Sequence, residues 1–551
     1  MLSRTFVTGI LLTTGAFAQL SSFPKPNYFR EVFRQSNTRV ELRDPVRLKD
    51  FVVGGKLELS LKNYLELVMA NNTSIQVAFL SLEIPKNNIV SAYGRWDPTA
   101  TASFGATRST SVPTSVASSA NVTLGAVSKS LNQPFQFQYS QALDTGTSYF
   151  VSMGATKNST SNSRSSFNPS LTSSMSFSAT QNLVRDRGRY INRIPVMIAE
   201  STYKRFGYTL RSTLLGTVSN AENVYWNVIN ARESLKVQEK ARDAADTNYK
   251  FVLQQLELGA IAQLDIYNPQ GQLASAEVAV SQAQFALAAA EDALRLQIGA
   301  DLDLDIRKLP IELTEPVDLG ATEALPFDAE EEVRKALANN PSVLSALQQM
   351  DLDELGIQSA RNGLLPQLSF TATYSGNGQG GTYIPSQTTL TGGFAAEPIP
   401  GGLGDALAQM WGLNNPTYLG RLSLTLPIRS RTASMTMANS LVTKKTDALN
   451  LRNTQEQTRL SILNAVTALK RAVESLKLSK IQQEIQVKNL DAQKQKYELG
   501  TITNDFVVTA IQSLVVAESQ VVTNQISVRT SLTLLLQQTG ELLDERGIIV
   551  K

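Results

Sequence analysis

The chain repeats its own sequence over most of its length, and this duplication limits its possible folds more than any other feature. Three sets of positions match in the same order along the two halves. They are residues 70–72 with 338–340, Pro98 with Pro366, and residues 258–261 with 499–502. The first two sets lie 268 residues apart and the third 241, so the first half holds 27 additional residues between Pro98 and Leu258. An ordered series of matches indicates two repeats of one structural unit.

Each repeat is expected to hold a helix, a β-rich segment, a long helix, a glycine turn and a further helix. The first repeat covers residues 57–299, with a helix at 57–93, a β hairpin at about 98–182, a long helix at 196–257 and a helix at 263–298. The second covers residues 328–540, with a helix at 328–362, a β hairpin at about 366–428, a long helix at 433–497 and a helix at 503–538. The remaining segments are 19–56 at the N-terminal side, a linker at 300–327 and a tail at 541–551.

The expected helices are unusually long. At 1.5 Å per residue, a helix over 433–497 is about 95 Å long, whereas globular helices average about 11–12 residues. Apolar residues of the 263–298 helix are spaced three and four apart, which is typical of a coiled coil. They are Leu273, Ala276, Val280, Ala283, Leu287, Ala290 and Leu294. Rods of this length without a thick core need neighbours, so the sequence predicts self-association.

The β-rich segments are dominated by Ser, Thr, Asn, Gly and aromatic residues. Their candidate strands alternate apolar with small polar side chains. The clearest are residues 101–106, 133–139, 175–180, 367–374 and 418–426. This alternation is typical of outer-membrane strands, and it is equally compatible with a soluble sandwich.

Composition excludes much of enzyme chemistry. The 551 residues include no Cys and no His, which removes thiol nucleophiles, cysteine metal sites and the commonest general base. The 51 basic and 48 acidic side chains leave a formal charge of +3, too small to predict a nucleic-acid partner. We therefore expect no enzymatic activity, no cofactor and no metal site.

Residues 1–18 have the features of a signal peptide. Arg4 precedes an apolar stretch from Phe6 to Leu12, and Ala16-Phe17-Ala18 supplies a small-x-small cleavage site. No later run of about 18 apolar residues is found, so the sequence predicts no transmembrane helix. An exported chain of this kind can span a membrane only as a closed barrel.

With this organisation, the sequence resembles the outer-membrane efflux protein family, the TolC-like channel-tunnel proteins. The resemblance covers about residues 57–540. Its marks are the two halves and four short motifs, namely Ala338-Asn339-Asn340-Pro341, Leu364-Leu365-Pro366-Gln367-Leu368, Leu258-Gly259-Ala260-Ile261 and the turn at 497–502. One departure stands out, because the first repeat offers four candidate strand stretches between 99 and 181 where the family has two. Either the hairpin is elongated outside the membrane or some of these stretches are loop, and we expect a long hairpin with Ser/Asn-rich extracellular segments near 110–130 and 157–168.

The resemblance implies a membrane β-barrel joined to a long α-helical coiled-coil barrel, in a homotrimer that shares one 12-stranded barrel with four strands per chain. It implies a passive exit duct in the outer membrane of a Gram-negative bacterium, with a long periplasmic portion. The partners would be outer-membrane lipid, a periplasmic adaptor protein and an inner-membrane transporter, either a proton-driven pump of an efflux system or an ABC exporter of type I secretion. The alternative is a periplasmic coiled-coil adaptor, against which the full duplication counts, and a third possibility is an exported hydrolase that uses carboxylate pairs.

By the same resemblance, the two glycine turns lie at periplasmic tips that close the tunnel and receive the adaptor. The tip positions are Leu258, Gly259, Leu499 and Gly500, and both glycines permit the positive φ that ends a helix. The candidate pore-gate residues are Asp265, Tyr497, Asp505, Phe506 and Thr509. Asp265 is alternatively an ordinary first-turn acid that the helix dipole favours.

Four other motifs have plain structural interpretations. Asp301, Asp303 and Asp305 lack the Gly and Glu of a calcium loop and suit a solvated linker. The glycine-rich stretch 376–381 is expected to be a loop. The segment 185–189 is expected to form a charged collar at the membrane boundary. Pro195 and Pro427 are expected to bend the chain from strand to helix.

Overall fold

The computed structural model divides the chain into two units, Met1–Asp44 and Pro45–Lys551. The residues that it describes lie in the second unit and are 51–53, 55–111, 127–161, 165–259, 261–300, 307–315, 328–384, 397 and 399–548. The expected signal peptide, Asp301, Asp303 and Asp305 therefore lie outside the described residues.

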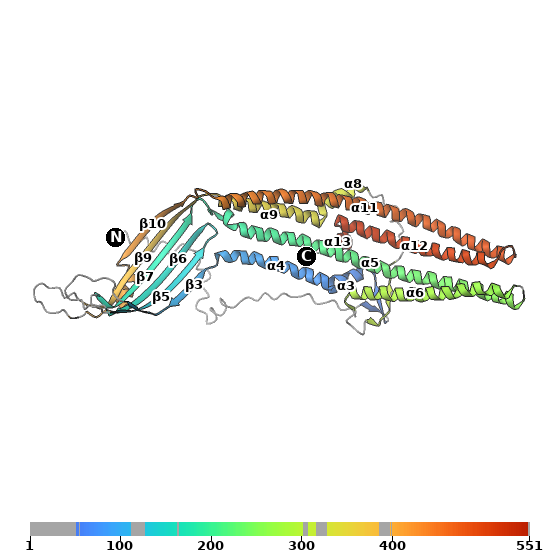
Figure 1. The fold of residues 1–551 in the computed structure, drawn as a ribbon, viewed down its shortest axis with the longest axis horizontal. Helices are drawn as coiled ribbons and strands as arrows, with labels where there is room; N and C mark the ends of the chain where they lie inside the picture. The colour runs from blue at the N-terminus through green and yellow to red at the C-terminus, as the bar shows by residue number, and fades with distance from the viewer. Residues whose placement is uncertain are drawn as a thin grey trace, which may run out of the picture. The chain divides into compact units, whose positions relative to one another are not determined.

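Two helices of nearly 70 residues dominate the helical part (Figure 1). The helices are α3 Leu61–Asn71, α4 Thr73–Tyr93, α5 Arg189–Glu257, α6 Tyr267–Gln297, α8 Ala329–Asn339, α9 Pro341–Gly363, α10 Leu403–Trp411, α11 Arg431–Glu498, α12 Asn504–Thr539 and α13 Leu542–Glu545, with 3₁₀ turns η3 Gly94–Trp96 and η4 Gln263–Ile266. At 1.5 Å per residue, the 69 residues of α5 extend about 100 Å. Helix α5 packs against α4, α6, α9 and α12, and α11 packs against α8, α9 and α12.

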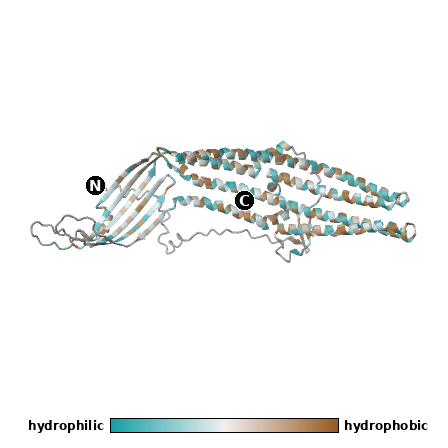
Figure 2. Cartoon of the chain, in the orientation of Figure 1, coloured by the Kyte–Doolittle hydropathy of each residue, from teal (hydrophilic) through white to brown (hydrophobic). Residues whose placement is uncertain are grey.

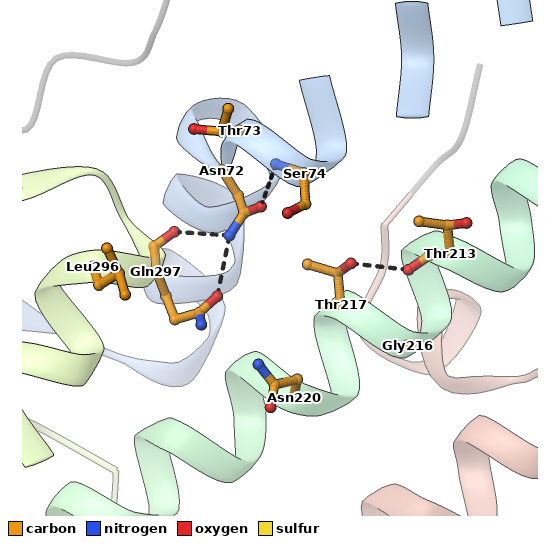
Figure 3. A pocket seen from close by; sticks show the side chains of 9 residues that line it. All are labelled: Asn72, Thr73, Ser74, Thr213, Gly216, Thr217, Asn220, Leu296 and Gln297. Carbon is orange, nitrogen blue, oxygen red and sulfur yellow. Dashed lines mark hydrogen bonds between the residues drawn. The ribbon is translucent and has the colours of Figure 1, made fainter. Parts of the chain in front are cut away.

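The Asn-Asn motif of each repeat breaks a helix in two. The side chain of Asn72 accepts a hydrogen bond from the Ser74 N–H at 2.9 Å, and Asn340 does the same with Ser342 at 2.9 Å, so each caps the helix that follows. The Asn72 amide also donates to the Gln297 backbone oxygen at the end of α6 (Figure 3). Asn340 donates to the equivalent oxygen of Gln538 at the end of α12. The matched contacts explain why both repeats keep this motif.

Seven strands form one antiparallel sheet in the order β10-β9-β7-β6-β5-β3, with β4 also paired to β5. The strands are β3 Thr99–Phe104, β4 Thr107–Ser111, β5 Ser128–Ala142, β6 Thr147–Thr160, β7 Phe167–Asn182, β9 Gln367–Tyr383 and β10 Pro416–Thr425. Since β3 and β4 follow one another along β5, the sheet has six strand positions. The expectation of four strands per chain is therefore wrong, because the first repeat contributes an additional hairpin, β5–β6.

The register gives the sheet one apolar and one polar face, and Figure 2 shows the alternation along the strands. In β9 and β10, Phe370 stands opposite Leu422 and Tyr374 opposite Tyr418, while Ser369 and Thr371, the neighbours of Phe370 along β9, point to the other face. Short helix α10 packs on the apolar face over β9. A Cβ on Gly378 would lie 1.8 Å from the Ala406 backbone oxygen, so glycine is required there. The 376–381 stretch is thus strand rather than the expected loop.

A small second sheet and a buried cluster join the two repeats. Its strands are β1 Val52–Val53, β2 Lys56–Leu59 and β8 Ile311–Leu313, so the chain is extended at residue 57 where a helix was expected. Tyr64, Tyr225 and Trp226 are buried in the core beside it. Within this core, the Glu222 carboxylate is fully buried and accepts hydrogen bonds from Arg546 at 2.6 Å and Thr533 at 2.6 Å.

Two expectations about the helices are corrected. Pro195 lies inside α5 and makes no junction; the chain turns earlier, where Asp186 and Gly188 adopt positive φ of 58° and 86°. Helix α12 is, by length and composition alone, apolar enough to cross a membrane, contrary to the expectation that no such helix is encoded. It packs against α11 and α5, as a core helix does.

Candidate functional site: the helical tips

The two glycine turns end the long helices at the side farthest from the seven-stranded sheet (Figure 1). Leu258 and Leu499 cap α5 and α11, and Gly259 and Gly500 follow with the same φ of 73°. This left-handed conformation suits glycine, and it reverses each chain into the next helix. The turns of the two repeats are therefore equivalent in geometry as well as in sequence.

Exposed leucines mark the surface of these tips. Leu258 and Leu499 are 84% and 78% exposed, and Leu264 in η4 is 76% exposed. Both helical hairpins therefore present large exposed apolar side chains at their tips, and these side chains are available to contact a partner protein.

Four contacts connect the α5–α6 hairpin to the α11–α12 hairpin. The Tyr497 hydroxyl donates a hydrogen bond to Oε1 of Gln255 at 2.7 Å, and the Tyr497 ring meets the Phe251 ring edge to face at 5.9 Å. On the other side of the turns, the Asn268 amide donates to the Asp505 carboxylate. Further along, Gln512 donates to Gln272 at 2.6 Å. These contacts hold the two hairpins of one chain together at their ends.

The tip environment favours the neutral form of Tyr497. Burial raises the pKa of its phenol, and the negative charge of Asp265 raises it further. The hydroxyl therefore keeps its proton, and with it the ability to donate to Gln255, beyond the usual range for tyrosine.

The other predicted gate residues have different surroundings. The Asp265 carboxylate is exposed and accepts a hydrogen bond from the Ala262 N–H at 3.2 Å, which caps η4 as an ordinary first-turn acid would. Phe506 is 55% exposed. The Thr509 hydroxyl donates to the Asp505 backbone oxygen at 2.8 Å, within its own helix. Tyr497 and Asp505 thus bridge the hairpins by hydrogen bonds, whereas the described hydrogen bonds of Asp265 and Thr509 stay within their own turn or helix.

Sequence reasoning missed the partners of the bridging residues. Gln255, Phe251, Asn268 and Gln272 are ordinary helical residues in sequence, without charge or motif. Their one available signal is the repeat register, because Gln272 and Gln512 lie 240 residues apart, close to the shift of 241 that relates the two glycine turns. In the described residues, no group of three or more carboxylate side chains is placed to hold a metal ion.

The chain thus joins a sheet with one apolar face to helices of about 100 Å that end in paired tips. Comparison of structures finds this fold in solved outer membrane channels. The chain is similar to CusC, whose crystal structures concern transmembrane channel formation, with a TM-score of 0.61 at 13% identity over 88% of this chain and 92% of that one. It is also similar to the CmeC outer membrane channel of Campylobacter jejuni, with a TM-score of 0.58 at 16% identity over 91% and 89%. The open-state MtrE outer membrane channel of Neisseria gonorrhoeae gives 0.58 at 16% over 88% and 89%.

The sequence comparison points the same way. Residues 150–300 match the model of the family described as outer membrane efflux protein. No curated protein matches the chain. The resemblance to the outer-membrane efflux protein family, drawn from the repeats and turns, is confirmed by this match and by the similarity to channels of that kind.

Proposed function

We propose that the protein is a trimeric outer-membrane channel and the passive exit duct of a tripartite efflux or type I secretion system. The observation that carries the proposal is the continuity of the apolar-faced sheet with helices long enough to cross a periplasmic space. No chemistry is required of such a duct. Its selectivity would come from bore, lining and the state of the tips.

Self-association is supported by the free edges of the helical layer. Helices α4 and α6 lie on one side of α5, and α11 lies at the other side of the chain. Both edges expose apolar side chains, including Val90 at 71% on α4, Phe285 at 75% on α6 and Val442 at 64% on α11. Repeated copies would bury these rows against one another, as coiled-coil neighbours do.

The tips are proposed as the gate. In the closed state, contacts such as Tyr497 with Gln255 hold the hairpins together, and Asp265, Asp505, Phe506 and Thr509 are candidates to line the opening. A periplasmic adaptor would dock on the exposed Leu258 and Leu499 beside Gly259 and Gly500. If the adaptor binds the open tip more tightly than the closed one, binding shifts the population toward the open state. The inner-membrane transporter then supplies the cargo.

Fractionation and electrophysiology test this function. The full chain should enter the outer-membrane fraction, need detergent for extraction and run as a heat-modifiable trimer. In planar bilayers it should conduct, with low conductance while the tips are closed. A water-soluble monomer without channel activity contradicts the proposal. A soluble or inner-membrane protein would instead favour the adaptor, an alternative that the comparisons leave without support.

A further inference from the structure

The additional hairpin β5–β6 is built into the sheet on both sides. Strand β5 pairs with β6 without interruption, from Ser130 opposite Thr160 to Ala142 opposite Ser148. Strand β6 pairs in the same way with β7, from Thr147 opposite Gln181 to Asn158 opposite Ser170. Strands β3 and β4 then pair with the far side of β5. The hairpin therefore occupies two interior positions of the sheet, and its removal would separate β3 and β4 from β7.

The turn of this hairpin is anchored to the start of α5. The Asp144 carboxylate forms ion pairs with Arg193 at 3.0 Å and Arg189 at 3.6 Å. Backbone hydrogen bonds connect Gly188 N–H to the Thr145 oxygen at 3.1 Å and Asn182 N–H to the Gly146 oxygen at 3.1 Å. The hairpin is thus fixed at the junction between sheet and helices, where the charged segment 185–189 lies.

Glycine is required in this turn. Gly146 has φ of 83°, and a Cβ there would lie 2.2 Å from the Asp186 backbone oxygen. Asp186 is itself held in place, because its backbone oxygen accepts from the Asn192 amide at 2.8 Å. The close approach of two backbones makes the hairpin turn part of the junction.

The two faces continue across the hairpin without a change of side. Phe137 stands opposite Met153, which stands opposite Met175, on the apolar face. Their neighbours Gln138 and Ser152 pair on the polar face. A hollow of about 610 Å³ lies on the polar side of the sheet and is lined by residues such as Gln136, Ser152, Thr172 and Asn377. The sheet is therefore concave toward its polar face, as the wall of a water-filled barrel is.

Both outer edges of the sheet are open in the described structure. Strand β10 is exposed along all ten residues, and β3 and β4 are exposed along all of theirs. Successive strand positions alternate in direction, and six is an even number. The β10 edge of one copy therefore meets the β3 edge of the next in antiparallel orientation, which permits closure by repeated copies.

From these observations we infer that hairpin β5–β6 is part of the membrane wall, and that a second copy of this chain pairs its β3–β4 edge with the open β10 edge. This inference rests on the proposed function, in which three copies of the chain form one barrel. With six strand positions per chain the barrel then has 18 strands, instead of the 12 that four strands per chain would give. At a strand spacing of about 4.8 Å and a tilt of about 40°, the backbone diameter rises from about 24 Å to about 36 Å. On the polar face of the described strands, Arg421 is the one charged side chain, so the lining is mostly hydroxyl and amide groups.

Disulfide cross-linking tests the edge assignment, and the cysteine-free chain provides a clean background. Ala102→Cys on β3 is combined in turn with Tyr418→Cys, Gly420→Cys and Leu422→Cys on β10, all on the apolar face. Oxidation of the full-length protein in outer membranes should produce covalent trimers from at least one pair. Ala102→Cys with Ser423→Cys, which lies on the opposite face, is the matched control and should cross-link at least several-fold less.

A second set of pairs distinguishes the alternatives. In a 12-stranded wall that leaves out β5, β3 and β4, strand β6 would face β10 of the next copy, so Val151→Cys should cross-link with the same β10 cysteines. Cross-linking of Val151 pairs, or membrane trimers in which no Ala102 pair cross-links, overturns the inference and leaves the proposed function intact. Absence of any membrane trimer overturns the proposed function itself. If the cysteine variants fail to assemble, the strand count in a cryo-EM map of the unmodified protein in nanodiscs decides, with 18 supporting the inference and 12 overturning it.

Discussion

The Tyr497 hydroxyl donates a hydrogen bond to the side-chain oxygen of Gln255 at 2.7 Å and so connects the last turns of the two longest helices of the chain. The two residues come from equivalent hairpins of the two repeats. Their contact is supported by the Tyr497 ring against Phe251 and, beyond the turns, by Asn268 with Asp505. If the tips are the gate, the closed state depends on a few neutral hydrogen bonds, each contributing about 1 kcal/mol.

Replacing Tyr497 by Phe should therefore loosen the closed tip. The ring contact with Phe251 stays and the hydrogen bond is lost, so we expect a several-fold rise in the open fraction of single channels in planar bilayers, corresponding to about 1 kcal/mol. Tyr267→Phe is the matched control, because Tyr267 also lies at the tip, is 61% exposed and has no described hydrogen bond from its hydroxyl. Equal behaviour of both variants would show that the Tyr497 hydroxyl does not restrain the tip.

Alkaline pH should have the same effect as this substitution. The pKa of Tyr497 is raised by burial and by Asp265, so its proton is held more tightly in the closed tip than in an open, solvated one. The stabilisation is fully present below the ordinary tyrosine pKa of about 10 and is lost as pH rises through the raised value. Conductance recorded from pH 8 to 11 should rise at the alkaline end in the original protein, and this rise should be smaller in Tyr497→Phe.

At Asp265, the charge and the helix cap can be separated. Asp265→Ala removes both the charge and the acceptor for the Ala262 N–H, with a cost of about 1 kcal/mol to η4, and we expect a higher single-channel conductance. Asp265→Asn keeps an acceptor and removes the charge. Measuring both in the same bilayers assigns the effect, and unchanged conductance in both would leave Asp265 as a helix-end acid without a role in the gate.

The repeats and the tip turns could be predicted from the sequence, because both depend on local chemistry. The capping asparagines at 72 and 340 and the glycines at 259 and 500 satisfy requirements that recur at fixed positions in each repeat. The pairing partners of Tyr497 and Asp505 could not be predicted in this way. They are neutral or common residues, and which of them meet depends on how two hairpins about 240 residues apart pack together.

The strand count shows the same limit. The 27 additional residues between Pro98 and Leu258 indicated an insertion, and the alternation marked its strands. Neither signal says whether a hairpin joins the sheet, because strand pairing is decided by non-local hydrogen bonds and by the docking of Asp144 and Gly146 on α5. The resemblance favoured four strands, and the structure has six positions.

The buried ion pair behind the C-terminal helix should be critical for stability. Arg546→Met leaves the Glu222 carboxylate buried without its cation, at a cost of about 3 kcal/mol, the lower end of the range for such a pair because Arg546 is 27% exposed. The melting temperature of the detergent-extracted protein should fall accordingly. The double variant Glu222→Leu with Arg546→Met should recover much of the loss, since no charge is then left unpaired. A double variant that is less stable than Arg546→Met alone would contradict this account.

Replacing Gly146 or Gly207 by Ala should have opposite effects on stability. Gly146→Ala places a Cβ 2.2 Å from the Asp186 backbone oxygen and strains a residue with φ of 83°, so the turn must move away from α5. The positive φ alone costs about 1–2 kcal/mol, and the clash adds to it. Gly207→Ala lies within α5 with open space around the new methyl group, and there it should stabilise the helix by about 0.5–1 kcal/mol. Melting of the heat-modifiable species on gels should therefore shift down for Gly146→Ala and up for Gly207→Ala, and a Gly146→Ala protein that assembles and melts like the original would show that the hairpin turn is not tightly docked.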